Sequence, residues 1–157
     1  YVRLGMSGER EFYSREHIAR IGGSHQLTDG KNLAVFCTGS MLSEVMEAQE
    51  LLKKDDCHAA VYDMYSIKPL DRQQVLKAAE NYKNLVTIEE HNIIGGLGSA
   101  VAEVLTEEGV GVPVLRIGLN DAFAIGYGTQ KEVRQMNGLD AGSLRNRIYD
   151  FLARKPA

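Results

Sequence analysis

Three consecutive ionisable side chains, Glu89, Glu90 and His91, are the residues of this sequence that could most readily take part in catalysis or ligand binding. They directly follow residues 85–88, a short apolar run that is typical of a strand covered on both faces. Open α/β sheets usually hold ligands at the carboxyl ends of their strands. A carboxylate at this position could act as a general acid or base if burial raised its pKa, and a carboxylate together with the histidine could bind a metal ion.

The spacing of the two glutamates argues against a catalytic pair. Successive residues of a strand point to opposite faces, so the side chains of Glu89 and Glu90 are expected to diverge. We therefore interpret Glu89, Glu90 and His91 as a crest that is solvated or faces another domain or subunit, and we predict no catalytic, cofactor-binding or metal-binding residue in this chain. The acidity of this crest also argues against phosphate binding.

A glycine cluster, Gly95, Gly96 and Gly98, separates the crest from a predicted helix. Dinucleotide-binding loops have glycines at this place, where the first amides of the helix receive a pyrophosphate. The spacing does not fit, because Val101 stands where such a loop needs a third glycine or alanine when counted from Gly96. We interpret the glycines as residues that let the helix pack closely against its neighbours.

Alternating strands and helices must position these residues. The predicted strands are residues 25–28, 33–37, 59–63, 85–88 and 112–118. Pro113 is expected among the first residues of its strand because proline cannot donate to a ladder. The Asp29-Gly30 turn directly before residues 33–37 predicts that the first strand lies antiparallel to its successor, as an edge strand. The fold class is therefore α/β: a three-layer αβα arrangement with a mostly parallel, doubly wound sheet of about five strands.

Five helices are predicted from apolar periodicity and capping signals. The expected N-caps of four of them are Ser40, Asp71, Thr129 and Asp140. The fifth helix begins at about Leu97 and ends before Gly109, which has the position of a left-handed C-terminal cap. The inward residues of the helix after Asp71 are expected to be Val75, Leu76, Ala79 and Tyr82.

Composition and charge narrow the class of protein. With 157 residues, 44% of them apolar and 25% charged, the chain has the size of one soluble globular domain. Its 18 basic and 21 acidic residues are spread along the chain, so we expect no binding to nucleic acid or to an anionic membrane. Cys37 and Cys57 lack metal-ligand spacing, and no membrane span or signal peptide is evident, which favours a cytoplasmic location.

The N-terminal residues predict a fragment of a longer protein. The chain begins without Met, and residues 1–5 read as the end of a strand whose beginning is missing. Residues 6–21 mix both charge signs without a clear apolar period, as a surface linker does. We therefore expect residues 1–21 to be the tail of a preceding domain with its linker, and residues 22–157 to be one domain.

Several motifs resemble the C-terminal domain of the transketolase family. Residues 86–91 (Val-Thr-Ile-Glu-Glu-His) and 94–100 (Ile-Gly-Gly-Leu-Gly-Ser-Ala) give the closest match. Residues 38–40, 66–71, 118–121 and 128–130 recur in the same order in that family. The match covers about residues 22–155 and is closest to transketolases that are split into two subunits. Single motifs are shared with deoxyxylulose-phosphate synthase and with the β component of 2-oxo acid dehydrogenases, which are the alternatives.

The resemblance implies that the parent enzyme transfers two-carbon ketol units between sugar phosphates in the pentose phosphate pathway. In that family thiamine diphosphate and its Mg²⁺ or Ca²⁺ ion are held by two other domains across a dimer interface. This chain contains neither the Gly-Asp-Gly metal signature nor the glutamate segment that activates the thiamine ring. We expect it to be inactive alone and to serve domain packing and subunit assembly, with the remaining domains or an N-terminal subunit as partners in a homodimer.

The resemblance implies one substrate-binding residue in this chain. Residues 1–5 look like the end of the pyrimidine-binding middle domain, where the family places an arginine that contacts the phosphate of the substrate. Arg3 matches that position, and a guanidinium suits bidentate recognition of phosphate. The alternatives are an arginine that merely flanks a strand and, for the chain as a whole, a regulatory α/β module that binds a small ligand at the crest.

Overall fold

The structure, a computed structural model, describes residues 1–3, 10–14, 16, 18–123 and 125–154. Five strands and five helices are found in this part of the chain. In chain order they are β1 (His25–Thr28), β2 (Leu33–Cys37), α1 (Met41–Lys53), β3 (Ala59–Asp63), α2 (Arg72–Asn81), β4 (Leu85–Asn92), α3 (Leu97–Glu107), β5 (Val114–Leu119), α4 (Gln130–Met136) and α5 (Ala141–Ala153).

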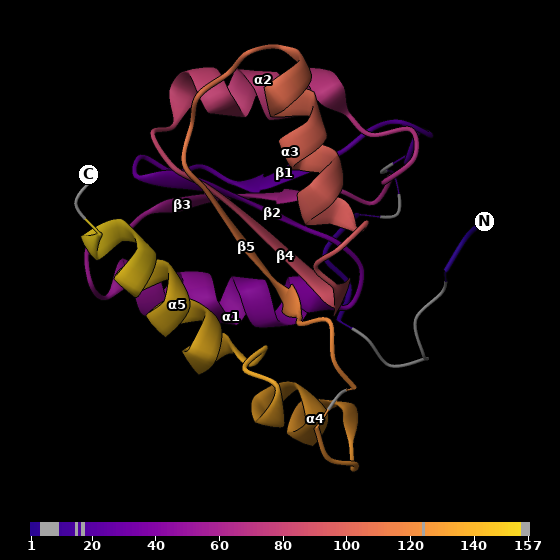
Figure 1. Cartoon of the computed structure of the whole chain (residues 1–157), viewed down its shortest axis with the longest axis vertical. Coiled ribbons are helices and arrows are strands. Elements are labelled where there is room, and N and C mark those ends of the chain that lie inside the picture. The colour runs from indigo at the N-terminus through magenta and orange to yellow at the C-terminus, as the bar shows by residue number, and fades with distance from the viewer. Residues whose placement is uncertain (4–9, 15, 17, 124, 155–157) are drawn as a thin grey trace.

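The elements form three layers around one mixed sheet (Figure 1). The strand order is β1-β3-β2-β4-β5, in which β2, β3, β4 and β5 are parallel and β1 pairs antiparallel with β3 at the edge. Helices α1 and α5 cover one face, helices α2 and α3 cover the other, and α4 lies beyond the end of the sheet (Figure 1). This arrangement confirms the predicted α/β class with one antiparallel edge strand. The predicted partner of that strand is wrong, because β1 pairs with β3 and not with its successor β2.

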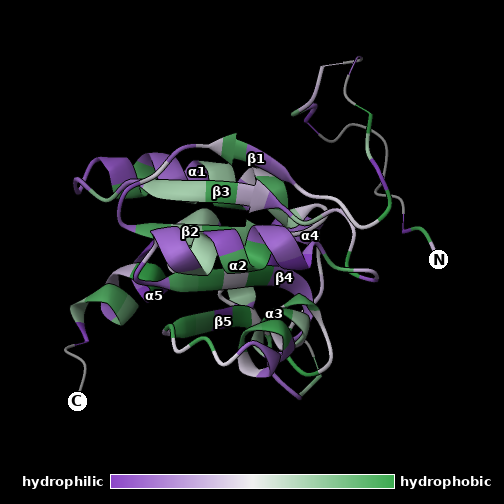
Figure 2. Ribbon diagram, turned by 90° about the horizontal axis from the view of Figure 1, so that it is seen from above, coloured by the Kyte–Doolittle hydropathy of each residue, from purple (hydrophilic) through white to green (hydrophobic). Residues whose placement is uncertain are grey.

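Two apolar cores fill the spaces between the layers. One joins the sheet to α1 and α5, and the other joins it to α2 and α3. Every residue of β2 and β3 is buried, because both central strands are covered on both faces. Figure 2 shows the result in the colouring: the central strands are largely hydrophobic, whereas the helices carry both hydrophobic and hydrophilic residues.

Strand β4 is longer than predicted, and this changes the setting of the crest. The strand was expected to end at Ile88, but pairing with β5 resumes at Asn92 after an irregularity, so Glu89 to His91 belong to the strand itself. Strand β5 in turn begins only after Pro113, which was predicted inside it. The Pro113 carbonyl still accepts from the Leu85 amide at 3.0 Å, whereas the missing N–H excludes this residue as a donor.

Three of the four predicted N-caps are confirmed. Asp71 accepts from the Gln74 amide, Thr129 forms the full capping box, and Asp140 accepts from an amide in the first turn of α5. Ser40 precedes α1 as expected but makes no capping hydrogen bond, because its hydroxyl binds side chains from other elements. Gly109 has the predicted left-handed conformation, with φ +66°.

Helix α2 buries a slightly different face from the one predicted. Val75 and Ala78 are the fully buried residues, whereas Leu76, Ala79 and Tyr82 are only partly buried at the margin of the same core. The four predicted residues thus all contact this core, and Ala78, which was not among them, is buried as well.

The described part of the predicted linker lies against the carboxyl edge of the sheet. Phe12 packs against the core beneath α1 and α5. The Tyr13 hydroxyl donates to the Asp63 carboxylate at the end of β3, and the Tyr13 ring stands edge-on to His25 with centroids 5.1 Å apart. Burial and the bond to Asp63 both raise the pKa of Tyr13, so it stays a phenol donor. The domain boundary after residue 21 remains a prediction, and residues 4–9, 15 and 17 lie outside the described part.

Candidate functional site

The centre of the sheet's carboxyl edge is where a ligand would be expected. Strands β2 and β4 are neighbours, yet β2 leads into α1 on one face and β4 leads to α3 on the other (Figure 1). In doubly wound sheets such a switch point is the usual binding crevice. Ser40 follows β2 and Glu90 lies near the end of β4, so both belong to this point.

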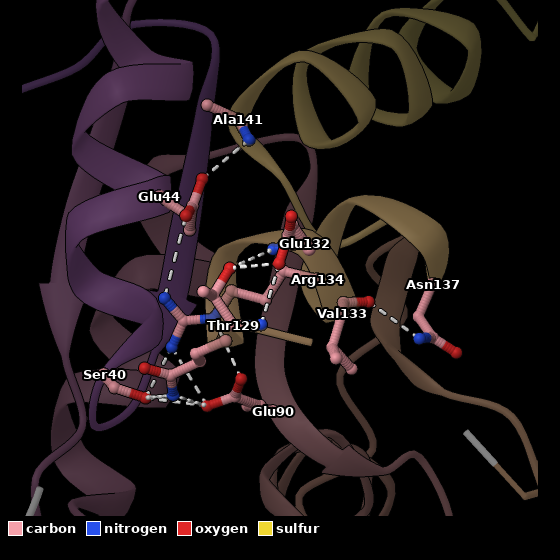
Figure 3. Close-up of polar contacts among 10 residues, drawn as sticks. Ser40, Glu44, Glu90, Thr129, Glu132, Val133, Arg134, Asn137 and Ala141 are labelled. Atoms are coloured by element: carbon pink, nitrogen blue, oxygen red, sulfur yellow. Dashed lines mark hydrogen bonds and ion pairs between the residues drawn. The ribbon is translucent and has the colours of Figure 1, made fainter. Parts of the chain in front are cut away.

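Arg134 from helix α4 fills the switch point (Figure 3). Its side chain is buried, with the residue 7% exposed. The guanidinium binds the Glu90 carboxylate through both oxygens, with Nε to Oε1 at 2.9 Å and Nη2 to Oε2 at 3.0 Å. Nη2 also donates to the Ser40 hydroxyl at 2.7 Å, and Ser40 donates to Glu90 at 2.8 Å. The chain therefore supplies its own bidentate cation where a ligand would sit.

Two further side chains extend this contact to other elements. Gln130, one turn before Arg134 on α4, donates to Glu90 at 2.9 Å. Glu44 of α1 lies 3.7 Å from Nη1 of Arg134, and its other oxygen accepts from the Ala141 amide at 2.9 Å, at the start of α5 (Figure 3). We call Ser40, Glu44, Glu90, Gln130 and Arg134 the Arg134 cluster. It ties α1, β4, α4 and α5 together.

The electrostatics of the Arg134 cluster keep Glu90 ionised. Burial alone would raise the pKa of Glu90, but the hydrogen bonds from Arg134, Ser40 and Gln130 and the positive charge of Arg134 outweigh it, so the pKa lies below its ordinary value. A general acid needs the opposite shift. Glu90 is therefore suited to holding Arg134 and not to transferring a proton at neutral pH.

The lowered pKa of Glu90 predicts a specific dependence of stability on pH. A carboxyl whose pKa is lower in the folded state contributes stability that is present above the unfolded value, about 4.3, and is lost as the pH falls through the folded value. The Glu90→Gln variant should be less stable than the wild type at pH 7, and the difference should shrink below about pH 4. Urea titrations from neutral to acid pH measure both values, with Glu103→Gln at an exposed site of α3 as the control. A difference that stays constant over this range would contradict the prediction.

Glu89 points to the opposite face of the sheet and binds helix α3. It is 2% exposed, and its two oxygens accept from the amides of Leu97 and Gly98 at 2.8 and 2.9 Å. The N-cap residue of α3 is Gly96, which has no side chain to offer. Glu89 thus performs the capping task from a neighbouring strand and places its negative charge at the positive end of the helix dipole.

The glycines make this approach possible. A Cβ on Gly96 would lie 1.8 Å from Oε2 of Glu89, and a Cβ on Gly98 would lie 2.7 Å from Oγ1 of Thr87. These distances support the interpretation of the glycines as a device for close packing. They also oppose a nucleotide at this helix, because the amides that would receive a pyrophosphate already bind the carboxylate of Glu89.

The three residues of the predicted crest therefore lie in three different settings. Glu89 and Glu90 diverge to opposite layers, in agreement with the alternation of a strand. Glu89 is buried within the chain, so the interpretation of this residue as solvated or interface-facing is wrong. His91 is exposed, with Nδ1 3.0 Å from the Asn92 carbonyl oxygen. An interface role for Glu90 and His91 remains a prediction.

The structure also bears on Arg3, on the two cysteines, and on possible metal sites and membrane spans. Arg3 is exposed and makes no ion pair or hydrogen bond with another described residue, so its phosphate role remains a prediction. Cys37 and Cys57 are free, buried thiols. No three His, Cys, Asp or Glu side chains converge as metal ligands within the described ranges. No helix among the described residues has the length and apolar run needed to cross a membrane.

Sequence reasoning missed the residue on which the site depends. Arg134 was not singled out, and Glu44 was noticed only for its position in the first turn of α1. The available signal was weak: Gln130 and Arg134 are four residues apart and share one face of a short polar helix. Nothing in that spacing indicates the carboxylate they bind, which lies forty or more residues away.

Comparisons with known proteins agree on one family. A family model described as "Transketolase, C-terminal domain" matches residues 22–144. A curated protein of Methanocaldococcus jannaschii, named as a transketolase C-terminal section, is 36% identical over 157 residues, which is 99% of this chain and 48% of that protein. The 1-deoxy-D-xylulose-5-phosphate synthase of Thermomicrobium roseum is 38% identical over 133 residues, 85% of this chain and 21% of the synthase. The chain thus spans half or less of the length of these curated relatives.

Solved structures give the same result. A chain described as a split-gene transketolase in an inactive β4 tetramer superimposes with a TM-score of 0.91 at 38% identity, covering 99% of this chain and 50% of that one. A transketolase from Campylobacter jejuni shares the fold, with a TM-score of 0.58 at 18% identity over 82% of this chain and 18% of the enzyme.

Proposed function

Because the chain belongs to the transketolase family as a C-terminal domain, we propose that it is the non-catalytic domain of a thiamine diphosphate enzyme, serving domain packing and subunit assembly. The parent enzyme transfers two-carbon ketol units between sugar phosphates, in the cytoplasm and as part of the pentose phosphate pathway. The partners are the remaining domains or an N-terminal subunit, within a homodimer.

One observation carries this proposal: the switch point of the sheet is filled by Arg134 and not left for a ligand. The second place that could hold a phosphate, the start of α3, is filled by Glu89. The residues of this chain therefore do not fit a diphosphate group. Both carboxylates fasten the chain's own helices, which is the chemistry of a structural domain and not of a catalyst.

The cofactor and the substrate phosphate belong to the parent enzyme in this proposal. Thiamine diphosphate with Mg²⁺ or Ca²⁺ is held by the other domains. Arg3 contributes to binding the phosphate of the sugar only when the domain that precedes it is present. The exposure of Arg3 and its lack of an ion pair with other described residues support this role, because a guanidinium engaged elsewhere would not be available.

A thermal-shift measurement tests the non-catalytic role. The melting temperature of this chain should not change when thiamine diphosphate and Mg²⁺ are added together. A ligand at about one hundred times its Kd would stabilise the folded state by about 2.7 kcal/mol. That corresponds to a rise of roughly 5 to 10 °C in a domain of this size. A reproducible rise of several degrees would overturn the proposal, and a complete transketolase in the same experiment is the positive control.

A second parent enzyme is favoured by a specific finding. The synthase from Thermomicrobium roseum is 38% identical to this chain over 85% of its length, and the transketolase section from Methanocaldococcus jannaschii is 36% identical over 99%. A deoxyxylulose-phosphate synthase, or less directly a 2-oxo acid dehydrogenase β component, would use the same kind of C-terminal domain. Activity measurements on the complete parent polypeptide with ketose phosphate donors and with pyruvate would separate these enzymes.

A further inference from the structure

Strand β5 forms the edge of the sheet opposite β1. It has six residues, and its pairing with β4 is regular from Val114 to Ile117. The other edge strand, β1, has four residues and an irregularity in its pairing with β3, which makes it a poor template for a further strand. No strand of the described part of the chain lies beyond β5, and α3 and α5 stand to either side of it (Figure 1). The β5 edge is therefore the place at which another strand could be added.

The pairing with β4 shows which backbone groups of β5 face outward. The Leu85 amide donates to the Pro113 carbonyl, and Leu85 lies opposite Val114. In a parallel ladder one residue bonds to the two residues that flank its partner, so the odd-numbered residues of β5 bond to β4. The N–H and C=O groups of Val114 and Arg116 consequently point away from the sheet. Both residues are partly exposed, so an extended peptide could reach these groups.

Two arginines beside this edge are partly buried without a counter-charge. Arg116 belongs to β5, and Arg147 belongs to α5. Neither guanidinium has an ion pair or hydrogen bond with another residue in the described ranges. Arg134 and Arg145, the other arginines in these ranges that are not exposed, each bind a carboxylate. Burial lowers the pKa of Arg147, as expected for a cation without a partner. Both guanidinium groups are therefore available to an acidic partner.

The two arginines flank β5 on opposite faces of the sheet. The Arg116 side chain lies toward α3, since a Cβ on Gly98 would be 3.1 Å from its Cδ. On the other face, α5 packs against α1 and β5, and Arg145 reaches Asp55 after α1, with Nε to Oδ2 at 2.9 Å. Arg147 is two residues later, about 200° around the helix, and so points away from α1 and toward the β5 edge. Because the side chains of a strand alternate between the faces, two neighbouring residues of an added strand would each meet one arginine.

A hollow between α3 and β5 gives room for a side chain on the Arg116 face. Its volume is about 380 Å³, and it is lined by Ser99, Ala102, Glu103, Thr106, Glu107 and Arg116. The two glutamates of the hollow do not serve as partners of Arg116. Glu107 accepts from Arg72 at 2.7 Å, and Glu103 is exposed, so that water weakens its field.

From these observations we propose that the β5 edge binds an extended segment of another protein that carries two neighbouring acidic residues. The segment adds a sixth strand to the sheet, with its backbone bonded to Val114 and Arg116. One carboxylate binds Arg116 on the α3 face and the other binds Arg147 on the α5 face, through charge-assisted hydrogen bonds. The backbone bonds supply affinity, and the two carboxylates fix the register and select the segment.

A blocked peptide, Thr-Val-Glu-Asp-Val-Thr, is the probe for this site. Titrated into the ¹⁵N-labelled chain, it should bind with a Kd below about 1 mM and shift the amide signals of Val114 and Arg116 most. The neutral peptide Thr-Val-Gln-Asn-Val-Thr should bind at least about tenfold more weakly, because it offers no charge to the arginines. The acidic peptide with N-methylated amides should be weakened to a similar degree, because its backbone can no longer donate to β5.

Variants of the two arginines test the same site from the side of the chain. Arg116→Gln and Arg147→Gln should each weaken binding of the acidic peptide by about tenfold. Both should keep the circular dichroism spectrum and melting temperature of the wild type, because neither guanidinium has a partner to lose among the described residues. Arg20→Gln is the control. Arg20 is exposed and its amide lies 3.5 Å from the hydroxyl of Tyr65, at the opposite side of the sheet, so this variant should bind like the wild type.

Three results would overturn the added strand. One is the absence of shifts at the β5 amides with up to about 2 mM acidic peptide. The second is equal affinity for the acidic and neutral peptides, which would mean that the arginines select nothing. The third is unchanged affinity for the N-methylated peptide, which would mean attraction between charges without a strand. The thiamine diphosphate measurement is independent of all three, so the proposed function is tested separately.

Discussion

Replacing Gly96 with alanine is expected to destabilise the folded chain by about 3 kcal/mol. The new Cβ would lie 1.8 Å from Oε2 of Glu89, so the carboxylate would have to move. A glutamate side chain can move, but here it would lose the amides of Leu97 and Gly98 and remain buried as a charge without partners. Urea unfolding followed by circular dichroism measures the change, which should also lower the melting temperature by roughly 6 to 12 °C.

A matched variant shows whether the cost comes from the contact or from glycine itself. Gly111→Ala adds the same methyl group where nothing lies within 4 Å, and its effect should be within about 0.5 kcal/mol of zero. A double-mutant cycle with Glu89→Ala locates the source, because Gly96→Ala should cost far less once the carboxylate is gone. If the cost were unchanged in that background, the clash with Glu89 would not be its cause.

Replacing Arg134 with methionine is expected to have an effect of similar size, about 3 to 4 kcal/mol. Methionine keeps much of the volume and removes the charge. It leaves Glu90 partly buried without its bidentate partner, and it removes the shorter of the two hydrogen bonds that Ser40 accepts. Removing one member of a buried ion pair costs more than the pair itself contributes, because the remaining charge stays desolvated. Chemical unfolding at pH 7 measures the loss.

The exposed arginine Arg72 provides the control for this variant. It bonds to Glu107 and Glu108 at 2.7 and 2.9 Å, and all three side chains are largely in solvent. Arg72→Met should leave the melting temperature nearly unchanged, because exposed ion pairs contribute little. Equal losses in the two variants would mean that burial of the Arg134 cluster does not matter. The double variant Arg134→Met/Glu90→Met should recover part of the lost stability, since the unpaired charge of Glu90 would then be gone.

The parts of the fold that depend on residues close together in the sequence were predictable. Apolar periodicity located the strands and helices, and the caps at Asp71, Thr129 and Asp140 were found because each binds an amide within three residues. The mostly parallel sheet followed from the alternation of strands and helices, whereas the Asp-Gly turn suggested β2 as the partner of β1, which in fact pairs with β3. These signals are short-range, and a single sequence contains them completely.

The candidate site was less predictable because its contacts join distant residues. Glu89 caps a helix from a strand, eight and nine residues before the amides it binds, and the turn between them has no capping pattern. Ser40 has the residue type of an N-cap, but Arg134, ninety-four residues later, takes its hydroxyl instead. The divergence of Glu89 and Glu90 could be predicted from the pleat of a strand. The groups that they bind on the two faces of the sheet could not.

The contact between Tyr13 and Asp63 limits how far a polypeptide attached before Tyr1 can lie from the sheet. Tyr1 precedes Tyr13 by twelve positions, and a fully extended chain of that length spans roughly 40 Å. A polypeptide attached there is confined to a sphere of that radius around the carboxyl edge of the sheet, on which the Arg134 cluster also lies. Tethers of this length give effective concentrations in the millimolar range. The Tyr13 contacts and the packing of Phe12 thus raise the local concentration of an attached polypeptide at this edge.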